Sequence, residues 1–415
     1  MYQSFKYRLY PFRSQEMELL RQLDELKFLH NYALEQRIDA WRTEKRSVGY
    51  TEQAASLTQW RNYDRNGIGR VHSQVAQECL QRIADSYKHF FRRLKEGTRP
   101  GFPHFRSEVT SLTYPQAYSA VTITEGRMGT KRLHLSKIGD VPIELHRQPV
   151  DGRIKTCTVK REGDRWYAVL TVEIPDAPTP PATSPVNPVG IDLGLNRIAT
   201  LSTGETVDPP RFLRKAEKRL KRLDREVSRK VKHSHNREKA KLRRARYFAK
   251  IRDRRRDFAH KLTTRWTSGY DLIAFEDLNV QSMIRGLNNA KSISDAGWGM
   301  LRQMSEYKQL KRSHRYVEVS ARNTTQTCST CGEYAYPPLE LKDRVFRCPN
   351  GHVEDRDINA ARNVVARALA AVPIRDYLDH RGCRGNSISP MSDTMSCAAV
   401  SLHSTGTEGL SIPSP

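Results

Sequence analysis

The stretch CPNGHVEDRDINAARN, residues 348–363, joins two patterns that decide how the C-terminal part of the chain folds. It begins with Cys348, the third thiol in the spacing Cys328, two residues, Cys331, sixteen residues, Cys348, which is that of a zinc ribbon. It continues into an acidic cluster, Asp355 to Asp357, that opens a helical pattern. The stretch is therefore a candidate for a metal site, an active site, or both.

The fourth ligand of the zinc pattern is not a cysteine. In the common pattern a cysteine would follow Cys348 after a gap of two residues, but Gly351 stands there and His352 comes next. A Cys-x3-His arm can reach tetrahedral geometry, so we expect His352 to be the fourth ligand. The alternatives are a site of three thiolates, a carboxylate substitute such as Glu354, and a finger that has lost its metal.

Three acidic residues occupy comparable places in the chain. Asp192 lies in the strand pattern VGIDLG, Glu276 ends the apolar run LIAFE, and Asp357 opens the helical pattern DINAARNVVARAL. Each alone fits a structural role, such as a favourable acid in the first turn of a helix. Together they would repel one another, and Mg²⁺ with oxygen ligands is the usual remedy. Two such ions about 3.5–4 Å apart support hydrolysis of a phosphodiester, so the pattern predicts cleavage of a nucleic-acid backbone.

The charge of the chain also indicates a polyanionic partner. Lys and Arg number 71 against 46 Asp and Glu, which gives a net charge of +25. Residues 211–256 hold 22 Lys and Arg against 5 Asp and Glu, in a helical pattern with a narrow apolar seam. The seam consists of Leu213, Ala216, Leu220, Leu223, Val227 and Val231. We prefer a nucleic-acid groove to the alternatives, which are a solvated helix pair and a basic membrane-surface protein.

The remaining sequence suggests two or three domains in 415 residues. Residues 12–97 show helical periodicity, whereas the chain from Gly101 to residue 174 is β-rich, with a hairpin turn at residues 162–164. The proline-rich residues 175–188 predict an extended linker, and the Ser- and Gly-rich tail after Leu378 predicts disorder.

The sequence shows neither a signal peptide nor a membrane-spanning segment. The start MYQSFKYRLY lacks the apolar segment of a signal peptide, and no run of about 18 apolar residues is present to span a bilayer. Seven cysteines form an odd and scattered set, unlike a disulfide framework. We expect a soluble protein of a reducing compartment, the bacterial cytoplasm, with no membrane partner.

Several segments, in this order and spacing, resemble the TnpB family, which small bacterial insertion sequences encode and which is similar to type V CRISPR effector nucleases. They are VGIDLG, FEDLNV, SISDAGWGMLRQMSEYK, TTQTCSTCG and DRDINAARN, with YRLYPFRSQEMELL, YKHFFRRLKEG, GFPHFR and RRDFAHKLT in support. The resemblance covers residues 1–378.

The resemblance implies a multidomain protein of α+β and α/β type. A β-barrel wedge domain would carry a helical recognition insert, followed by an RNase H-like RuvC nuclease domain with a zinc-ribbon insert. The implied boundaries are 1–11 and 98–176 for the wedge, 12–97 for the recognition lobe, 177–188 for the linker, 189–322 and 353–378 for the nuclease, 323–352 for the zinc insert, and 379–415 for a disordered tail.

The resemblance also implies an RNA-guided DNA endonuclease of a transposable element. It assigns Asp192, Glu276 and Asp357 as catalytic ligands of Mg²⁺, with Asp355 as a neighbour that bonds or caps. The partners would be a guide RNA from the end of the element and a target DNA beside a short flanking motif, bound by a monomer with one RNA. The alternatives are a nuclease-inactive regulator that binds guide and DNA, and a transposon-associated DNA-binding protein.

Recognition of a flanking motif needs a few polar side chains that reach into a groove. Ser73 and Gln77 lie one helical turn apart on the second helical stretch, and Tyr50 lies in the loop region before it. We expect these three residues to contact DNA, with ordinary exposed residues as the alternative.

Overall fold

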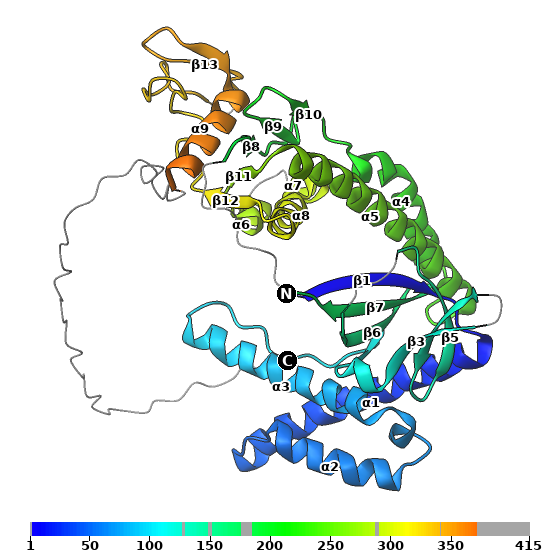
Figure 1. The fold of residues 1–415 in the computed structure, drawn as a ribbon. Helices are drawn as coiled ribbons and strands as arrows, with labels where there is room; N and C mark the ends of the chain where they lie inside the picture. Colours follow the sequence, from blue (N-terminus) through cyan, green and yellow to red (C-terminus); the bar gives the residue numbers. More distant parts are fainter. Residues whose placement is uncertain are drawn as a thin grey trace, which may run out of the picture. The chain divides into compact units, whose positions relative to one another are not determined.

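The computed structural model describes residues 2–126, 129–147, 152–175, 185–286, 290–340 and 342–371. In these ranges the strands form a seven-stranded sheet, a five-stranded sheet and a two-stranded sheet. Figure 1 shows the fold coloured along the sequence. Most of the predicted linker 177–188 and the whole of the predicted tail 379–415 lie outside the described residues. Across the described ranges, no helix is both long and apolar enough to cross a membrane.

The seven-stranded sheet pairs all of its neighbouring strands antiparallel, in the order β2-β6-β7-β1-β5-β4-β3. Its strands are β1 (Tyr2–Leu9), β2 (Ser111–Tyr114), β3 (Val121–Glu125), β4 (Lys131–Leu135), β5 (Gly139–Glu144), β6 (Ile154–Glu162) and β7 (Arg165–Glu173). The predicted hairpin is confirmed as β6–β7, with Gly163 at a positive φ in its turn. Trp166, Ala168, Leu170 and Val172 alternate into the core. The predicted closure of this sheet into a barrel stays a prediction.

Three helices follow β1 in the chain: α1 (Arg13–Glu44), α2 (Tyr50–Tyr63) and α3 (Ser73–Lys95). The 3-10 turn η1 (Ile68–Arg70) lies before α3, and η2 (Ala117–Ser119) lies between β2 and β3. Apolar residues at helical spacing, among them Leu19, Leu23 and Leu26, enter the same core as the seven-stranded sheet. The helices and this sheet therefore share one apolar core.

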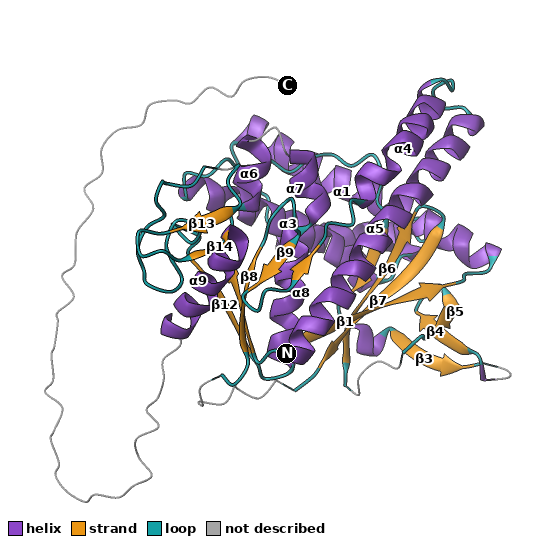
Figure 2. Ribbon diagram, turned by 90° about the horizontal axis from the view of Figure 1, so that it is seen from above, coloured by secondary structure: helices purple, strands orange, loops and turns teal. Residues whose placement is uncertain are grey.

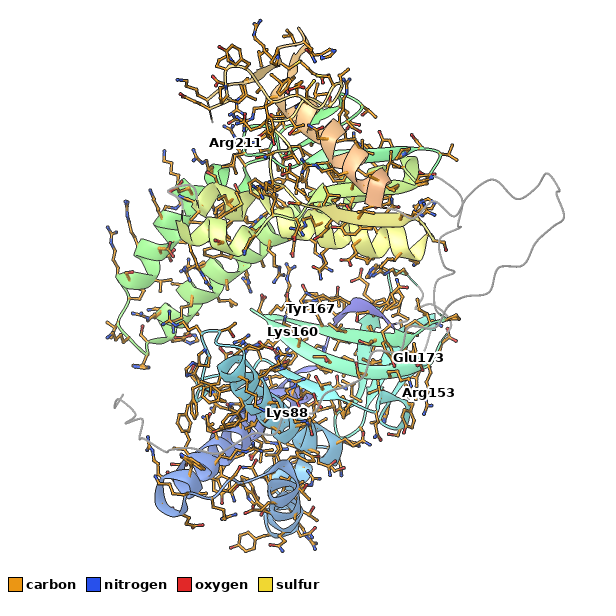
Figure 3. All side chains as sticks on the ribbon, turned by 90° about the vertical axis from the view of Figure 1, so that its left-hand side faces the viewer. Lys88, Arg153, Lys160, Tyr167, Glu173 and Arg211 are labelled. Carbon is orange, nitrogen blue, oxygen red and sulfur yellow. The ribbon has the colours of Figure 1, made fainter. Side chains whose placement is uncertain are left out.

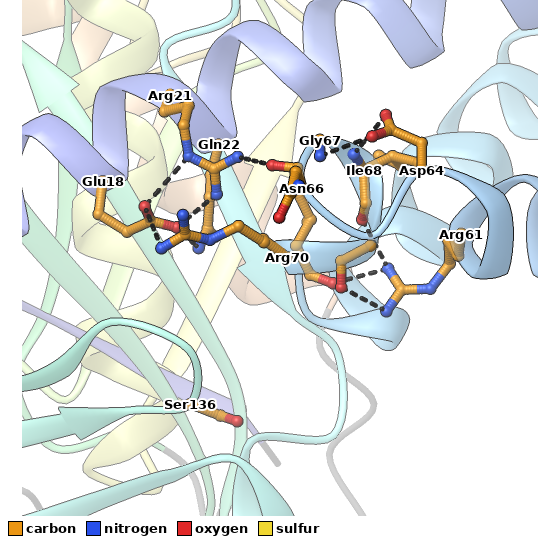
Figure 4. Close-up of polar contacts among 12 residues, drawn as sticks. Glu18, Arg21, Gln22, Arg61, Asp64, Asn66, Gly67, Ile68, Arg70 and Ser136 are labelled. Atoms are coloured by element: carbon orange, nitrogen blue, oxygen red, sulfur yellow. Dashed lines mark hydrogen bonds and ion pairs between the residues drawn. The ribbon is translucent and has the colours of Figure 1, made fainter.

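Polar contacts hold the turn between α2 and α3 against α1, as Figure 4 shows. Glu18 accepts hydrogen bonds from Arg21 at 2.6 Å, and Arg70 lies 3.4 Å from the same carboxylate. Arg21 also donates to the carbonyl of Asn66 at 2.7 Å, and Arg61 donates to the carbonyl of Val71 at 2.6 Å. By bonding these carbonyls, the arginines fix the chain at the entry into α3.

The five-stranded sheet has the order β10-β9-β8-β11-β12. Its strands are β8 (Pro188–Asp192), β9 (Ala199–Leu201), β10 (Thr206–Val207), β11 (Leu272–Glu276) and β12 (Arg315–Val319). The first three pair antiparallel in chain order, whereas β11 runs parallel to both β8 and β12. The helices after β10 are α4 (Phe212–Ser228), α5 (His235–Gly269), α6 (Val280–Gly286), α7 (Ala290–Ala296), α8 (Trp298–Lys311) and α9 (Arg356–Ala371).

The two faces of this sheet contact different helices. Ile191, Ile273 and Phe275 share a core with α5 and α8, whereas Ala274 shares a core with α9. Gly190 also faces α9, because a Cβ there would overlap the carbonyl oxygen of Ala361. Figures 1 and 2 show α9 beside β8, where its backbone approaches the strand closely. Because side chains alternate between the two faces of a strand, only residues on the same face as Gly190 and Ala274 can meet side chains from α9.

The basic region 211–256 forms the helical hairpin α4–α5. Its seam is formed by Ala216, Leu220 and Ile251, with Phe212 and Leu213 packed beside them. The predicted apolar seam was wrong at its last residue, Val231. Helix α4 ends at Ser228, and Val231 lies in the connection to α5 with 76% exposure. The cationic side chains remain on the outer surfaces of the hairpin, since the seam is narrow.

We expect Gly190→Ala to destabilise the protein, because the added methyl group would lie 2.7 Å from the amide nitrogen of Val365 as well as against Ala361. Overpacking of this kind costs about 1–3 kcal/mol. The matched control is Gly299→Ala in α8, where no atom lies within 4 Å of the added group. Thermal unfolding followed by circular dichroism should show a lower midpoint for Gly190→Ala alone, and equal midpoints would contradict the close approach.

Candidate active site and metal centre

Asp192 and Glu276 end two neighbouring parallel strands at the same edge of the five-stranded sheet. In the register of β8 and β11, Gly190 lies beside Ala274, so the residues two positions further on lie side by side. Because side chains alternate along a strand, both carboxylates share the face that α9 covers. Both are buried, with 9% exposure for Asp192 and 6% for Glu276. The sheet therefore brings two acidic side chains together beneath one helix.

Asp357 lies in the first turn of α9, near enough for its charge to act on Asp192. The preceding Asp355 caps this helix, because its Oδ1 accepts hydrogen bonds from the backbone N–H of Asp357 at 2.9 Å and of Ile358 at 3.3 Å. Arg197, from the segment between β8 and β9, donates to the other oxygen of Asp355 at 2.9 Å. Arg344 lies 3.8 Å from the carboxylate of Asp357. The start of α9 is thereby tied to the segment that follows Asp192.

Burial and neighbouring charges both act on the pKa values of the two strand-end carboxyl groups. Burial raises the pKa of Asp192 well above its ordinary value, and the charges of Glu276 and Asp357 raise it further. Burial also raises the pKa of Glu276, while a hydrogen bond from Thr324 and the charge of Arg367 oppose that shift. Buried acids with a raised pKa are a common feature of functional sites. Their oxygen atoms are the donors that Mg²⁺ prefers.

The four predicted zinc ligands come together as one cluster of three cysteines and a histidine. The ligand atoms of Cys328, Cys331, Cys348 and His352 all lie within 4.8 Å of one another. The Nδ1 of His352 is 3.3 Å from the sulfur of Cys348 and 3.6 Å from that of Cys328. Sulfur and imidazole ligands in this number could hold a zinc ion.

Gly351 explains how the arm reaches this geometry without a fourth cysteine. Its φ is +81°, a conformation that glycine adopts without strain, and its N–H donates to the carbonyl of Cys348 at 3.0 Å. The tight turn brings His352 back over Cys348, between β13 (Val345–Arg347) and β14 (Val353–Asp355). Hydrogen bonding to the backbone of Glu333 lowers the pKa of the Cys331 thiol to about 6. A thiol with this pKa favours the thiolate form that binds metal.

The sequence interpretation missed the residues that join this cysteine–histidine module to the carboxylates. Asn359 and Asn363, one turn apart on α9, bond the backbone of residues 324–329, and Thr324 bonds Glu276. The stretch DINAARN contains both asparagines at a spacing of four, which places them on one helix face. That spacing was the available signal, but the sequence alone does not reveal that this face is buried.

The three candidate DNA contacts lie apart from this centre, on the helices after β1. Ser73 and Gln77 are exposed in the first two turns of α3. The placement of Tyr50 in a loop was wrong, because it is the first residue of α2 and packs half-buried against the core. The backbone leaves an extended conformation at Gly49 and becomes helical at once. Their role in DNA binding stays a prediction.

Three segments of the chain match models of known families. Residues 169–286 match a family described as "Probable transposase" (OrfB_IS605), and residues 298–364 match "Cas12f1-like, TNB domain". Residues 1–46 match a "Helix-turn-helix domain", although here they hold β1 and the single helix α1. The second match spans the whole cysteine–histidine cluster.

Solved structures of low sequence identity share the fold. A Cas12f1 complex with sgRNA and target DNA has a TM-score of 0.58 at 13% identity, over 88% of this chain and 98% of the other. The mini-RNA-guided endonuclease CRISPR-Cas_phi3 has a TM-score of 0.51 at 9% identity, over 90% and 93%. The chain is thus a mixed α/β protein with the architecture of these nucleases.

Two relatives are similar over almost their whole length. A protein of Streptomyces pristinaespiralis, named as a candidate RNA-guided DNA endonuclease, is 36% identical over 89% of this chain and 90% of its own. The candidate RNA-guided DNA endonuclease InsQ of Escherichia coli is 31% identical over 89% and 93%. With this identity and coverage, and with the motifs around Asp192, Glu276 and Asp357 in place, the chain belongs to the TnpB family.

Proposed function

We propose that this protein is an RNA-guided DNA endonuclease of a transposable element, which cuts target DNA by metal-assisted hydrolysis. The observation that carries the proposal is the meeting of Asp192, Glu276 and Asp357 at the ends of β8 and β11 and the start of α9. The names of the relatives support the guided activity. A guide RNA from the end of the element and a DNA target beside a short flanking motif are the partners that we propose.

The three carboxylates would act as ligands of Mg²⁺, and their oxygen donors suit that ion. When bound, a pair of such ions supplies an activated water and stabilises the leaving oxygen of a phosphodiester. Two of the three acids end rigid strands, and the third lies on a helix capped by Asp355, so their positions are set before substrate binds. The order of the five-stranded sheet supports an RNase H-like, RuvC-type nuclease domain.

Cationic surfaces support the binding of nucleic acid. A cleft of about 1340 Å³ is lined by the α4–α5 hairpin and the β6–β7 turn. Its arginines are Arg165, Arg219, Arg243, Arg244, Arg246, Arg252 and Arg254. On the seven-stranded sheet, Lys160 lies opposite Tyr167, and Lys6 lies 4.0 Å from the centre of that ring; Figure 3 labels the first two. Distributed cations of this kind suit a guide–target heteroduplex held by its backbone.

The domain boundaries follow as part of the same proposal. We assign residues 1–11 and 98–176 to a wedge domain, 12–97 to a recognition lobe, and 189–322 and 353–378 to the nuclease domain. Residues 323–352 form a zinc insert in this assignment. The fit of three thiols and one imidazole supports one structural zinc ion.

A nuclease-inactive regulator that binds guide and DNA is the strongest rival. Such a protein would be free to lose any of the three carboxylates, yet all three are present, with Asp192 and Glu276 on one face of the sheet and Asp357 on the helix that covers it. Buried like charges destabilise a fold, so a chain that had no use for these acids would gain stability by losing them. Activity is therefore the better reading of the site.

We expect the purified protein with its RNA to cut a matched DNA duplex in Mg²⁺, and Asp192→Ala to slow cutting at least a hundredfold. Loss of metal-based stabilisation of the transition state costs several kcal/mol, and about 1.36 kcal/mol is tenfold in rate. The control is Asp208→Ala, which removes an exposed acid beyond β10. Cleavage that persists in Asp192→Ala while DNA binding is unchanged would refute the assignment of the site.

We expect one zinc ion per chain, and its loss in His352→Ala. The imidazole lies within 3.6 Å of two cysteine sulfurs, so its removal leaves one coordination position without a protein ligand. Elemental analysis by mass spectrometry measures the ion, and His89→Ala on the exposed side of α3 is the control. Full zinc occupancy in His352→Ala would exclude this histidine as a ligand.

A further inference from the structure

Thr324 makes a buried contact with one of the three carboxylates. Its hydroxyl lies 2.5 Å from Oε1 of Glu276 and 3.1 Å from the carbonyl of Ala321, and both side chains are buried, at 2% and 6% exposure. A hydroxyl has one proton, and the shorter contact to a carboxylate is the stronger of the two. The hydroxyl therefore donates to Glu276.

The backbone of Thr324 is itself fixed by α9. Asn363 donates to the carbonyls of Thr324 at 2.8 Å and Thr327 at 2.6 Å. Asn359 donates to the carbonyl of Thr327 at 2.8 Å and accepts from the N–H of Ser329 at 2.8 Å. Both asparagines are buried, so these bonds are shielded from water and costly to break.

This network joins the two metal-binding regions through one helix. The segment 324–329 begins with the hydroxyl that holds Glu276 and passes through Cys328, the first thiol of the cysteine–histidine module. Helix α9, whose Asn363 bonds this segment, also carries Asp357 in its first turn. A shift of the module would therefore reach two of the three carboxylates through covalent bonds and buried hydrogen bonds.

We propose that Thr324 is a positioning residue for Glu276, and that through it the cysteine–histidine module sets how tightly the carboxylate cluster holds a divalent cation. The inference rests on the proposed function and adds a link between its two metal sites. The hydroxyl holds one oxygen of Glu276 and thereby limits the rotation of the whole carboxylate. Partners of this kind orient metal-binding carboxylates, and their loss costs about 10–100-fold in metal affinity or activity.

The test compares Thr324→Val, which keeps the shape and loses the hydroxyl, with Thr324→Ser, which keeps the hydroxyl. Each full-length protein is purified with its RNA. Three quantities are measured: zinc per chain, the affinity for Mn²⁺, and the Mg²⁺ concentration that gives half-maximal cleavage. We expect Thr324→Val to need at least about tenfold more Mg²⁺ and to bind Mn²⁺ correspondingly more weakly, with zinc unchanged. Thr324→Ser should stay within about threefold of the wild type.

A second variant tests the link itself. Cys331→Ser removes an exposed ligand of the module and touches none of the carboxylates. We expect it to lose zinc and to weaken Mn²⁺ binding in the same direction as Thr324→Val. If Thr324→Val does not fold, as judged by its melting curve, this variant and Thr324→Ser decide the outcome.

Three results would overturn the inference. They are a wild-type metal response in Thr324→Val, an equally poor response in Thr324→Ser, and unchanged Mn²⁺ affinity in zinc-depleted Cys331→Ser. The proposed function fails separately, through undiminished cleavage by Asp192→Ala. If Asp192→Ala is inactive and Thr324→Val behaves like the wild type, the proposed function stands and this inference is wrong.

Discussion

The close packing of α9 on β8 is the constraint on which the rest of the site depends. Gly190 lets the helix backbone approach the strand until the carbonyl of Ala361 occupies the space of a missing side chain. Two residues later the strand ends in Asp192, and the same helix begins with Asp357 in its first turn. Because glycine is the only residue without a Cβ, this one position sets the separation of the two acids.

The site also shows how a strongly basic chain keeps acidic groups together. Asp192 and Glu276 are buried, and burial raises the pKa of both carboxyl groups. Positive groups approach the edge of the cluster, with Arg367 acting on Glu276 and Arg344 lying near Asp357. A divalent cation would relieve the remaining repulsion, and this is the physical reason for proposing a metal site here.

The sequence predicted the parts of this site better than their connections. Apolar runs placed Asp192 in a strand and Glu276 at the end of one, and the spacing of the thiols indicated the metal module. Those patterns arise from residues close together in the chain, so a single sequence is enough to recognise them. The roles of Thr324 and Asn363 depend on which polar residues are buried by distant segments, and periodicity carries no such information. Tyr50 and Val231 were misplaced for a related reason, because helix ends are set by individual backbone angles.

The central claim is that Asp357, delivered by α9, completes one divalent-metal site with the two strand-end carboxylates. The most direct measurement is Mn²⁺ binding by electron paramagnetic resonance to the zinc-loaded protein and to Asp357→Asn, which keeps the side-chain shape and removes the charge. The account predicts saturable Mn²⁺ binding by the wild type that falls at least about tenfold in affinity in Asp357→Asn. Equal Mn²⁺ affinity in the two proteins, with zinc retained in both, would contradict it.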